Sequence, residues 1–282
     1  MTALETSPHP LIDIGANLTH DSFDHDREQV IQDAEAVGVS RMILTGASVK
    51  GSRQALALAE QWPQRFWSTA GVHPHMARHY VDETNDILRG FLASEKCVAV
   101  GECGLDYFRN FSEPDDQQRA FRAQLEIACD LNYPVFLHQR DAHEDFLAIL
   151  DEYLPRLPHA VVHCFTGSGE ELDHYIERDL YVGITGWICD ERRGTHLRDI
   201  VDRIPDDRIM VETDAPYLLP RDLKPKPSTR RNEPKWLPHV LFRVAECRGV
   251  SHETLARQTT ANAERFFRLG EENQMRREMH AK

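Results

Sequence analysis

The sequence has no long apolar segment. No run approaches the ~20 apolar residues that a membrane-spanning helix requires, so no contact with a membrane is expected. The first ten residues, MTALETSPHP, hold neither a basic nor an apolar stretch, and no secretory signal is expected from them. Internal repeats and low-complexity linkers are also missing. These absences predict a cytoplasmic location.

Cysteine pairs are missing as well. The six cysteines show no CxxC spacing, and most lie in apolar segments, which favours buried, reduced thiols over a disulfide framework or a zinc ribbon. They are Cys97, Cys103, Cys129, Cys164, Cys189 and Cys247.

Positive charge is scarce. The chain has 33 Lys and Arg residues against 46 Asp and Glu residues, for a net charge of −13. This balance argues against a protein that coats nucleic acid. A nucleic-acid enzyme is still compatible with it, because a local basic patch can act on an acidic body.

The chain does contain a regular alternation of apolar, β-branched runs with segments of helical spacing, in 282 residues of ordinary globular composition. The runs are near-continuously apolar, which is typical of parallel strands covered on both faces. Eight such units predict a TIM-like (β/α)8 barrel, with residues 1–10 as a flexible N-terminus, 11–269 as one barrel domain and 270–282 as a polar tail. The predicted strands are 11–17, 41–47, 66–74, 97–106, 134–141, 160–167, 181–188 and 209–216.

Helices are expected at 25–38, 113–132 and 169–178, with Pro114 in the first turn of the second. The competing fold is a doubly wound open sheet. Its dinucleotide-binding form is unsupported, because GANL follows the first strand in place of GxGxxG.

Ionisable residues stand at the ends of six predicted strands, where barrel enzymes assemble their active sites. Singly, each has an ordinary explanation: a hydrogen-bonded structural histidine, or an acid that caps the next helix. Together, their charge would be costly to bury unless a divalent cation balanced it, and Mg²⁺, Mn²⁺ or Zn²⁺ suits such ligands. The ionisable residues are Asp13, His73, His75, Glu102, Asp106, His138, His163, Glu212 and Asp214, and the amide residue Asn17 follows the first strand.

Several long motifs resemble the TatD family of metal-dependent nucleases: GVHPH, GECGLDYFRNFS, HCFTG, GITGWICDERRG, ETDAPYLLPRDLKPKPSTRRNEP and TTANAERFF. The resemblance covers residues 11–269. It implies a barrel of the metallo-dependent hydrolase superfamily and a Mg²⁺-dependent 3′-5′ exonuclease that prefers single strands. It also implies Glu102, His138, His163 and Asp214 as metal ligands. Asp214, which could reach both the metal and a bound water, and Glu102 are the predicted catalytic residues.

The first strand departs from this pattern. Many relatives carry Asp-x-His-x-His, whereas this chain reads Asp13-Ile-Gly15-Ala-Asn17. The missing histidines predict one tight metal site and a weaker second one, which would rely on Asp214, a shared Glu102, water, and Asp13 or Asn17. Oxygen ligands and retained water suit Mg²⁺ better than Zn²⁺.

The substrate is predicted to be a single-stranded DNA or RNA 3′ end, bound by a monomer. Residues 219–235 hold six Lys or Arg residues against two acids, and arginine matches phosphate oxygens well. Trp187 could stack on a base, as could Phe108 and Phe111. The predicted substrate contacts are His73, Asn17, Arg221, Arg230, Arg231 and Trp187.

Two other functions remain open at this point. One is a metallohydrolase of the same barrel that acts on ester or amide bonds, for example in aminoacyl-tRNA deacylation. The basic loop favours a phosphate-bearing substrate over it, and no lysine ends a strand where a carbamate could bridge two metals. The other is a non-catalytic binding protein, which the presence of all four predicted ligands argues against.

Overall fold

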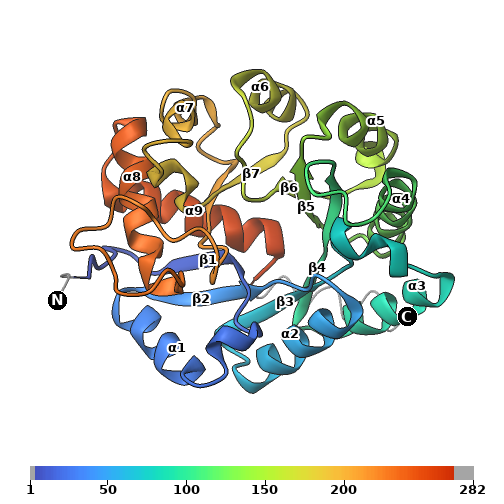
Figure 1. Ribbon diagram of the computed structural model, residues 1–282, viewed down its shortest axis with the longest axis horizontal. Coiled ribbons are helices and arrows are strands. Elements are labelled where there is room, and N and C mark those ends of the chain that lie inside the picture. Colours follow the sequence, from blue (N-terminus) through green and yellow to red (C-terminus); the bar gives the residue numbers. More distant parts are fainter. Residues whose placement is uncertain (1–3, 270–282) are drawn as a thin grey trace.

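The computed structural model describes residues 4–269, so the predicted tail at 270–282 and the first three residues lie outside the described part (Figure 1). Eight parallel strands form one sheet in the order β1 to β8, which confirms the predicted barrel. The segment after β8 joins β1 through hydrogen bonds of 2.8 Å from Asp214 N to Gly15 O and from Asn17 N to Ala215 O. The strands are β1 Leu11–Ala16, β2 Val39–Leu44, β3 Phe66–Ala70, β4 Cys97–Asp106, β5 Val135–Arg140, β6 Ala160–Val162, β7 Tyr181–Ile184 and β8 Ile209–Val211.

Helices surround the strands on the outside, and the three helices expected from the sequence are present within one or two residues (Figure 1). Pro114 opens α4, as predicted, with two acids in the first turn. None of the described helices is long and apolar enough to cross a membrane. The helices are α1 Arg27–Ala36, α2 Val49–Gln61, α3 Asp82–Leu92, α4 Pro114–Leu131, α5 His143–Tyr153, α6 Gly169–Glu177, α7 Thr195–Arg198, α8 Leu237–Arg248 and α9 His252–Phe267.

Most strands end earlier than the sequence suggested. The expected strand at 160–167 stops at Val162, and the expected strand at 209–216 stops at Val211. The residues that follow these two strands do not continue in the extended conformation, because Cys164 has φ 47° and Asp214 has φ 53°. This correction has a functional meaning, because His163 and Asp214 lie in the loops at the carboxyl ends of the strands.

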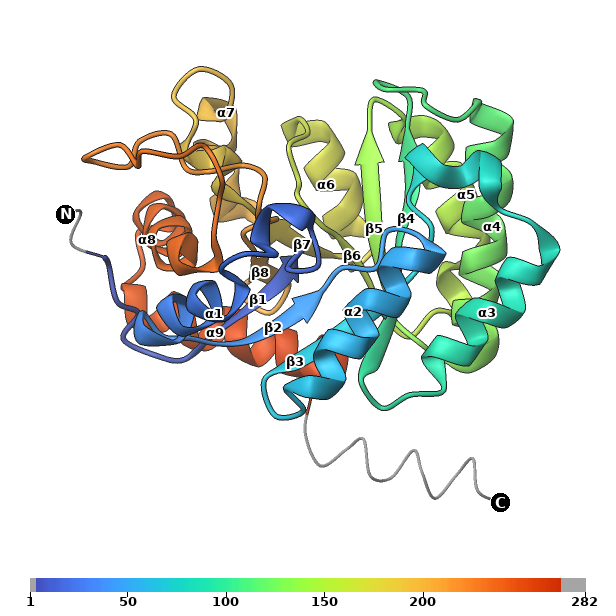
Figure 2. The same ribbon diagram turned by 60° about the horizontal axis from the view of Figure 1, so that its bottom comes forward.

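The inside of the barrel is apolar at one end and polar at the other. At the amino-terminal end, Ile12, Phe136 and Met210 pack with Phe266 and Phe267 of α9, which closes the bottom (Figure 2). The buried carboxylates lie toward the other end, where Figure 2 shows the loops after the strands. Within residues 4–269, the fold therefore closes the amino-terminal end of the barrel and leaves the other end for chemistry.

The predicted flexible N-terminus is described from residue 4 onward. Ser7 N donates to Val37 O at 2.9 Å, and Thr260 of α9 donates its hydroxyl to Pro10 O at 2.8 Å. These bonds connect the segment before β1 to α9 and to the turn after α1.

Candidate metal centre

Glu102 of β4 lies at the centre of a cluster of imidazoles. Its Oε1 atom is 2.8 Å from His163 Nε2, 3.1 Å from His138 Nδ1 and 3.3 Å from His73 Nε2. Glu102 is only 7% exposed. Burial acts to raise the pKa of its carboxyl group, but His163, His73 and His138 hold that pKa well below its usual range. A carboxylate is therefore present among three ring nitrogens from three other strand ends.

This cluster fits a divalent cation. One ligand atom each from His73, Glu102 and His138 lies within 4.8 Å of the others. His138 Nε2 is buried and makes no hydrogen bond within residues 4–269, although Asp106 Oδ2 lies 3.4 Å away. Burial lowers the pKa of His73 to about 4, so this ring is neutral and able to donate a lone pair. Mixed carboxylate and imidazole donors suit Mn²⁺ and Zn²⁺, and Mg²⁺ with added water.

Glu212 supports His163 from behind. Its Oε2 lies 3.3 Å from His163 Nδ1, and its Oε1 accepts from the backbone N–H of Cys164. The side chain is completely buried. A carboxylate on the far nitrogen of a ligating histidine fixes the ring and strengthens its donor atom. The sequence showed Glu212 at a strand end but gave it no role; its spacing of two residues from Asp214 was the available signal.

Glycines make room for Glu212. A Cβ atom at Gly15 of β1 would lie 2.4 Å from Glu212 Oε2, and one at Gly183 of β7 would lie 2.5 Å from Oε1. Position 15 is one of the two places where histidines are missing. The structure shows that the Glu212 carboxylate occupies the space beside it.

Asp214 is near enough to His163 and Glu102 for both to act on its pKa, and the Asn17 amide donates to Asp214 Oδ1 at 3.0 Å. Burial raises the pKa of Asp214 to about 7. Asp13 does not join it. Asp13 Oδ1 accepts from Gly15 N at 3.2 Å and from Thr213 N at 3.0 Å, and its Oδ2 accepts from the Thr213 hydroxyl. Both Asp13 oxygens thus accept hydrogen bonds, and the expectation that Asp13 or Asn17 could help to hold a second ion stays a prediction.

Asp106 is a further residue to which the sequence gave no role. Its Oδ2 lies 2.7 Å from His75 Nε2, and the side chain is 1% exposed. The rings of His75 and His73 are 4.2 Å apart between centroids. Asp106 thus orients the histidines next to the cluster, with His138 also within 3.4 Å.

The predicted phosphate-binding arginines have different surroundings. Arg231 forms a two-point ion pair with Asp26, at 2.9 and 2.6 Å, and a third contact of 3.0 Å with Glu233. Arg221 lies 3.6 Å from both Asp190 and Glu191. Arg230 is exposed and makes no hydrogen bond or ion pair with the described residues. Of the three, Arg230 is therefore the one most available to a ligand.

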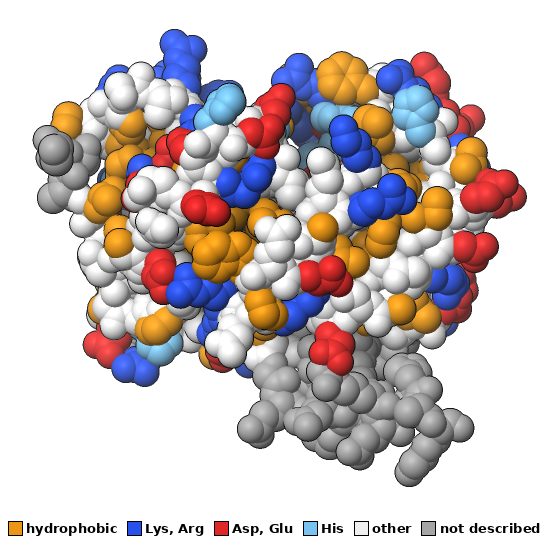
Figure 3. Space-filling model, turned by 90° about the horizontal axis from the view of Figure 1, so that it is seen from below, with side chains coloured by type: hydrophobic (Ala, Val, Ile, Leu, Met, Phe, Trp, Pro, Cys, Tyr) orange, Lys and Arg blue, Asp and Glu red, His pale blue; other side chains and the backbone are white. Residues whose placement is uncertain are grey.

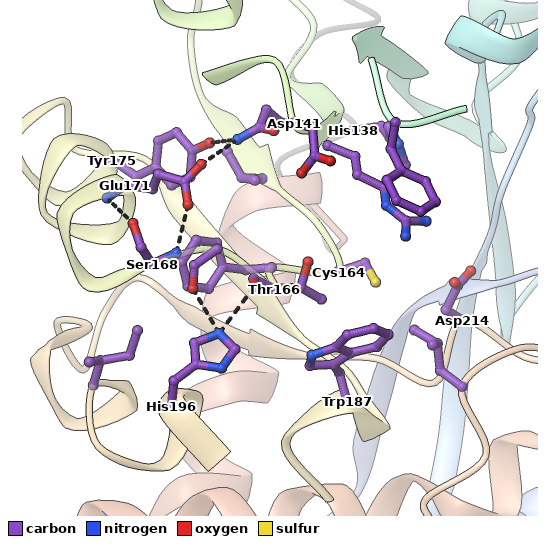
Figure 4. Close-up of a pocket in the computed structure, with 18 of the residues that line it drawn as sticks. His138, Asp141, Cys164, Thr166, Ser168, Glu171, Tyr175, Trp187, His196 and Asp214 are labelled. Atoms are coloured by element: carbon purple, nitrogen blue, oxygen red, sulfur yellow. Dashed lines mark hydrogen bonds between the residues drawn. The ribbon is translucent and has the colours of Figure 1, made fainter. Parts of the chain in front are cut away.

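A cavity of about 700 Å³ opens beside the metal cluster (Figure 4). His138 and Asp214 form one end of it, and it extends past Trp187 toward Ser168 at the start of α6. The Arg193 guanidinium lies 4.2 Å from the centre of the Trp187 ring. In Figure 3, Lys, Arg and His side chains stand along the upper edge of the molecule on both sides of a notch, with Asp and Glu side chains among them.

A second group of candidate ligands, Cys189, Asp222 and His239, lies away from this centre. His239 contacts Asp222 at 2.7 Å and Glu5 at 2.9 Å, and Arg243 donates to Asp222 at 2.9 Å. The neighbouring carboxylates raise the pKa of His239 against the effect of burial. Asp222 is thus already paired with two basic side chains, His239 and Arg243, without an ion.

An eight-stranded barrel with histidines and carboxylates gathered at the carboxyl ends of its strands has the architecture of metal-dependent hydrolases. The model of the family of TatD related DNases matches residues 12–268, and the chain belongs to that family.

Individual relatives agree with this assignment. The chain is 55% identical to the 3′-5′ ssDNA/RNA exonuclease TatD of Dickeya dadantii, over 93% of this chain and 99% of the relative. It is 53% identical to the protein of the same name from Pectobacterium carotovorum, over 92% of this chain and all of the relative. Among solved structures, the TatD homologue YjjV of Escherichia coli superposes with a TM-score of 0.83 at 28% identity, over 92% of this chain and 98% of that one. An uncharacterized amidohydrolase from Saccharomyces cerevisiae reaches the same TM-score at 22% identity, covering 92% of this chain and 100% of that one, and shares the fold.

Proposed function

We propose that the protein is a metal-dependent 3′-5′ exonuclease that hydrolyses phosphodiester bonds at the 3′ ends of single-stranded DNA or RNA. The observation that carries this proposal is the Glu102 carboxylate held among three imidazoles at the open end of the barrel. Membership of the TatD related DNases supports it, as do the names of the two exonucleases that share more than half of its residues.

Glu102, His138, His163 and Asp214 would hold the divalent ion, with His73 next to them. Mg²⁺ is the proposed ion, and Mn²⁺ or Zn²⁺ could take its place. When bound, it would supply Lewis-acid activation of a phosphate oxygen and of water. A weaker second position would depend on Asp214, Glu102 and Asp13 or Asn17, although both Asp13 oxygens already accept hydrogen bonds from Thr213 and Gly15.

Asp214 is the proposed group that orients the attacking water and accepts its proton. Asn17 fixes one of its oxygens at 3.0 Å, which leaves the other free to face water. Glu212 and Asp106 hold His163 and His138 in place, so the cluster is organised before substrate arrives.

Substrate phosphates would meet basic side chains on the loop after β8. Arg230 and Arg221 are the proposed contacts, and Trp187 is the proposed stacking residue. His73 would contact the substrate or keep Glu102 oriented. The six unpaired thiols suit a reducing cytoplasm. The monomeric state stays a prediction.

The test starts with protein stripped by a chelator. A 5′-labelled single strand is followed with and without added Mg²⁺, in the wild type and in Glu102→Gln. We expect a ladder that shortens from the 3′ end, returns with Mg²⁺ and is absent in the variant. Intact strands with Mg²⁺, Mn²⁺ and Zn²⁺ alike would overturn the proposal, and a panel of esters, amides and aminoacyl-tRNA would then be assayed.

A further inference from the structure

Two glutamines of α4 are almost completely buried. Gln117 and Gln124 are each 1% exposed, although glutamine is a polar residue that mostly faces water. They are seven residues apart on one face of the helix, about 10 Å along its axis. A carboxamide in such a place is costly unless its oxygen and its nitrogen are both bonded. The other buried residues of α4 are all apolar: Ala120, Phe121, Leu125, Ile127 and Ala128.

Gln124 binds the backbone of the residue that precedes His73. Its Oε1 accepts from Val72 N at 2.7 Å, and its Nε2 donates to Val72 O at 3.1 Å. The pairing of β3 with β4 ends two residues before Val72, so the carboxamide supplies the partners that a neighbouring strand no longer supplies. It thereby fixes the backbone from which the His73 ring reaches Glu102, with 3.3 Å between Nε2 and Oε1.

Gln117 binds the last residue of β4 in the same way. Its Oε1 accepts from Asp106 N at 2.8 Å, and its Nε2 donates to Asp106 O at 3.1 Å and to Ser112 O at 2.9 Å. The Asp106 carboxylate in turn lies 3.4 Å from His138 Nε2, while the other nitrogen of that ring lies 3.1 Å from Glu102. Gln117 therefore sets the place from which Asp106 meets the His138 ring.

We propose that Gln117 and Gln124 are positioning residues of the metal centre. Each fixes both backbone groups of one residue at the carboxyl end of a strand, and α4 thereby sets where His73 and His138 stand relative to Glu102. The inference rests on the proposed metal-dependent function and adds the helix that keeps its side chains in place. Ligands that are already in position lose less freedom when an ion binds, which raises the affinity.

A matched set of variants separates positioning from stability. Gln117→Met and Gln124→Met keep the length and the helix propensity of glutamine but remove its hydrogen bonds. Asn262→Leu is the control at the closed end of the barrel. Asn262 of α9 is 2% exposed and donates to Asp206 O at 2.9 Å and to Ile209 O at 2.8 Å. Its loss also leaves buried backbone groups without partners, but far from the carboxyl ends of the strands.

Calorimetric titration of the chelator-stripped proteins with Mn²⁺ measures the effect, at a temperature where each is folded. We expect Gln117→Met and Gln124→Met to bind Mn²⁺ about tenfold more weakly than the wild type, the lower end of the effect of supporting contacts. Asn262→Leu should unfold at a lower denaturant concentration and bind Mn²⁺ as the wild type does.

The outcomes divide the positioning role from the function on which it rests. Wild-type affinity in both glutamine variants would overturn the positioning role, as would an equal loss of affinity in Asn262→Leu. A wild type that binds no divalent ion would instead reject the metal centre itself. A wild type that binds Mn²⁺ but leaves single strands intact would reject the exonuclease and not the positioning role.

The route from Gln117 through Asp106 has its own test. Gln117 reaches His138 only by way of the Asp106 side chain, whereas Gln124 acts on His73. In an Asp106→Ala background, Gln117→Met should therefore cost little further Mn²⁺ affinity, and Gln124→Met should keep its full effect. Full additivity of Gln117→Met with Asp106→Ala would reject this route.

A measurement on the wild type does not depend on the folding of any variant. If the two carboxamides hold the backbone before an ion arrives, the amides of Val72 and Asp106 are protected from hydrogen exchange in the stripped protein. We expect both to exchange at least about a hundredfold more slowly than an unprotected amide, with little further protection from Mn²⁺. Rapid exchange that slows only when Mn²⁺ is added would overturn the proposal, because the metal and not α4 would then order these residues.

Discussion

Glu212 Oε2 lies 3.3 Å from His163 Nδ1, on the side of the ring that faces away from Glu102. The two carboxylates therefore hold one imidazole between them, and together they raise the pKa of His163 well above its usual range against the effect of burial. In the presence of a metal ion, the Glu212 contact fixes which nitrogen carries the proton and which one faces the ion.

Glu212→Gln should weaken metal binding without loss of the fold. Loss of such a supporting carboxylate typically reduces metal affinity by about 10- to 100-fold. Calorimetric titration of the stripped protein with Mn²⁺ measures the change. Glu253→Gln, on the exposed surface of α9, is the control and should bind as the wild type does. Unchanged Mn²⁺ affinity in Glu212→Gln would show that Glu212 contributes to the structure of the barrel and not to metal binding.

Metal binding should also strengthen as pH rises. Burial raises the pKa of Asp214 to about 7 in the metal-free protein, and neighbouring carboxylates raise the pKa of His138 and of His163. All three groups must lose a proton before they bind a cation. Below the pKa of its group, each released proton contributes up to about tenfold in affinity per pH unit. Mn²⁺ titrations from pH 5.5 to 8.5 should show this rise, and Asp214→Asn should reduce its slope. Affinity that falls with pH would contradict these pKa directions.

Gly15 should tolerate no side chain. A Cβ atom there would lie 2.4 Å from Glu212 Oε2 and 3.3 Å from the Phe136 ring, so the Glu212 side chain would have to move. Gly15→Ala should lower the free energy of unfolding by about 1–3 kcal/mol and weaken metal binding through Glu212. Gly90→Ala is the matched control. A Cβ atom at Gly90 in α3 meets nothing within 4 Å, and alanine should stabilise that helix by about 0.5–1 kcal/mol. Denaturant unfolding of both variants measures the contrast.

The fold could be predicted because its signal is local. Each strand is a short apolar run, and a run such as Cys97–Asp106 is visible without knowledge of its neighbours. Glu102, His138 and His163 were found for the same reason, since each stands at or near the end of such a run. Their assignment as ligands stays a prediction, but the structure does bring their side chains together around Glu102 Oε1.

The roles that sequence could not reveal depend on contacts across the barrel. Glu212 acts on a histidine 49 residues away, and the engagement of Asp13 depends on Thr213, 200 residues away. The distinction between Arg230 and Arg231 is of the same kind. The two are neighbours in one basic loop, and only the position of Asp26, 205 residues from Arg231, separates their roles.

The different surroundings of Arg230 and Arg231 predict different effects of their removal. Arg231 is held by Asp26 and Glu233 and lies over the Phe23 ring, with 4.8 Å from its guanidinium carbon to the ring centre. Arg231→Ala should therefore lower the free energy of unfolding, by about 1–2 kcal/mol. The exposed Arg230 has no such partners among residues 4–269, so Arg230→Ala should leave unfolding unchanged and weaken the binding of single strands.

Salt dependence separates the two effects. A lost phosphate contact reduces the slope of log affinity against log salt concentration by about one. Arg230→Ala should show that reduction in fluorescence anisotropy titrations of a labelled single strand, with the chelator present to prevent cleavage. Arg231→Ala should keep the wild-type slope when its binding is measured well below its unfolding temperature, where the variant is folded. If fully folded Arg231→Ala showed a reduced salt slope, the substrate would have to displace Asp26 from Arg231. Arg231 would then count as a phosphate contact.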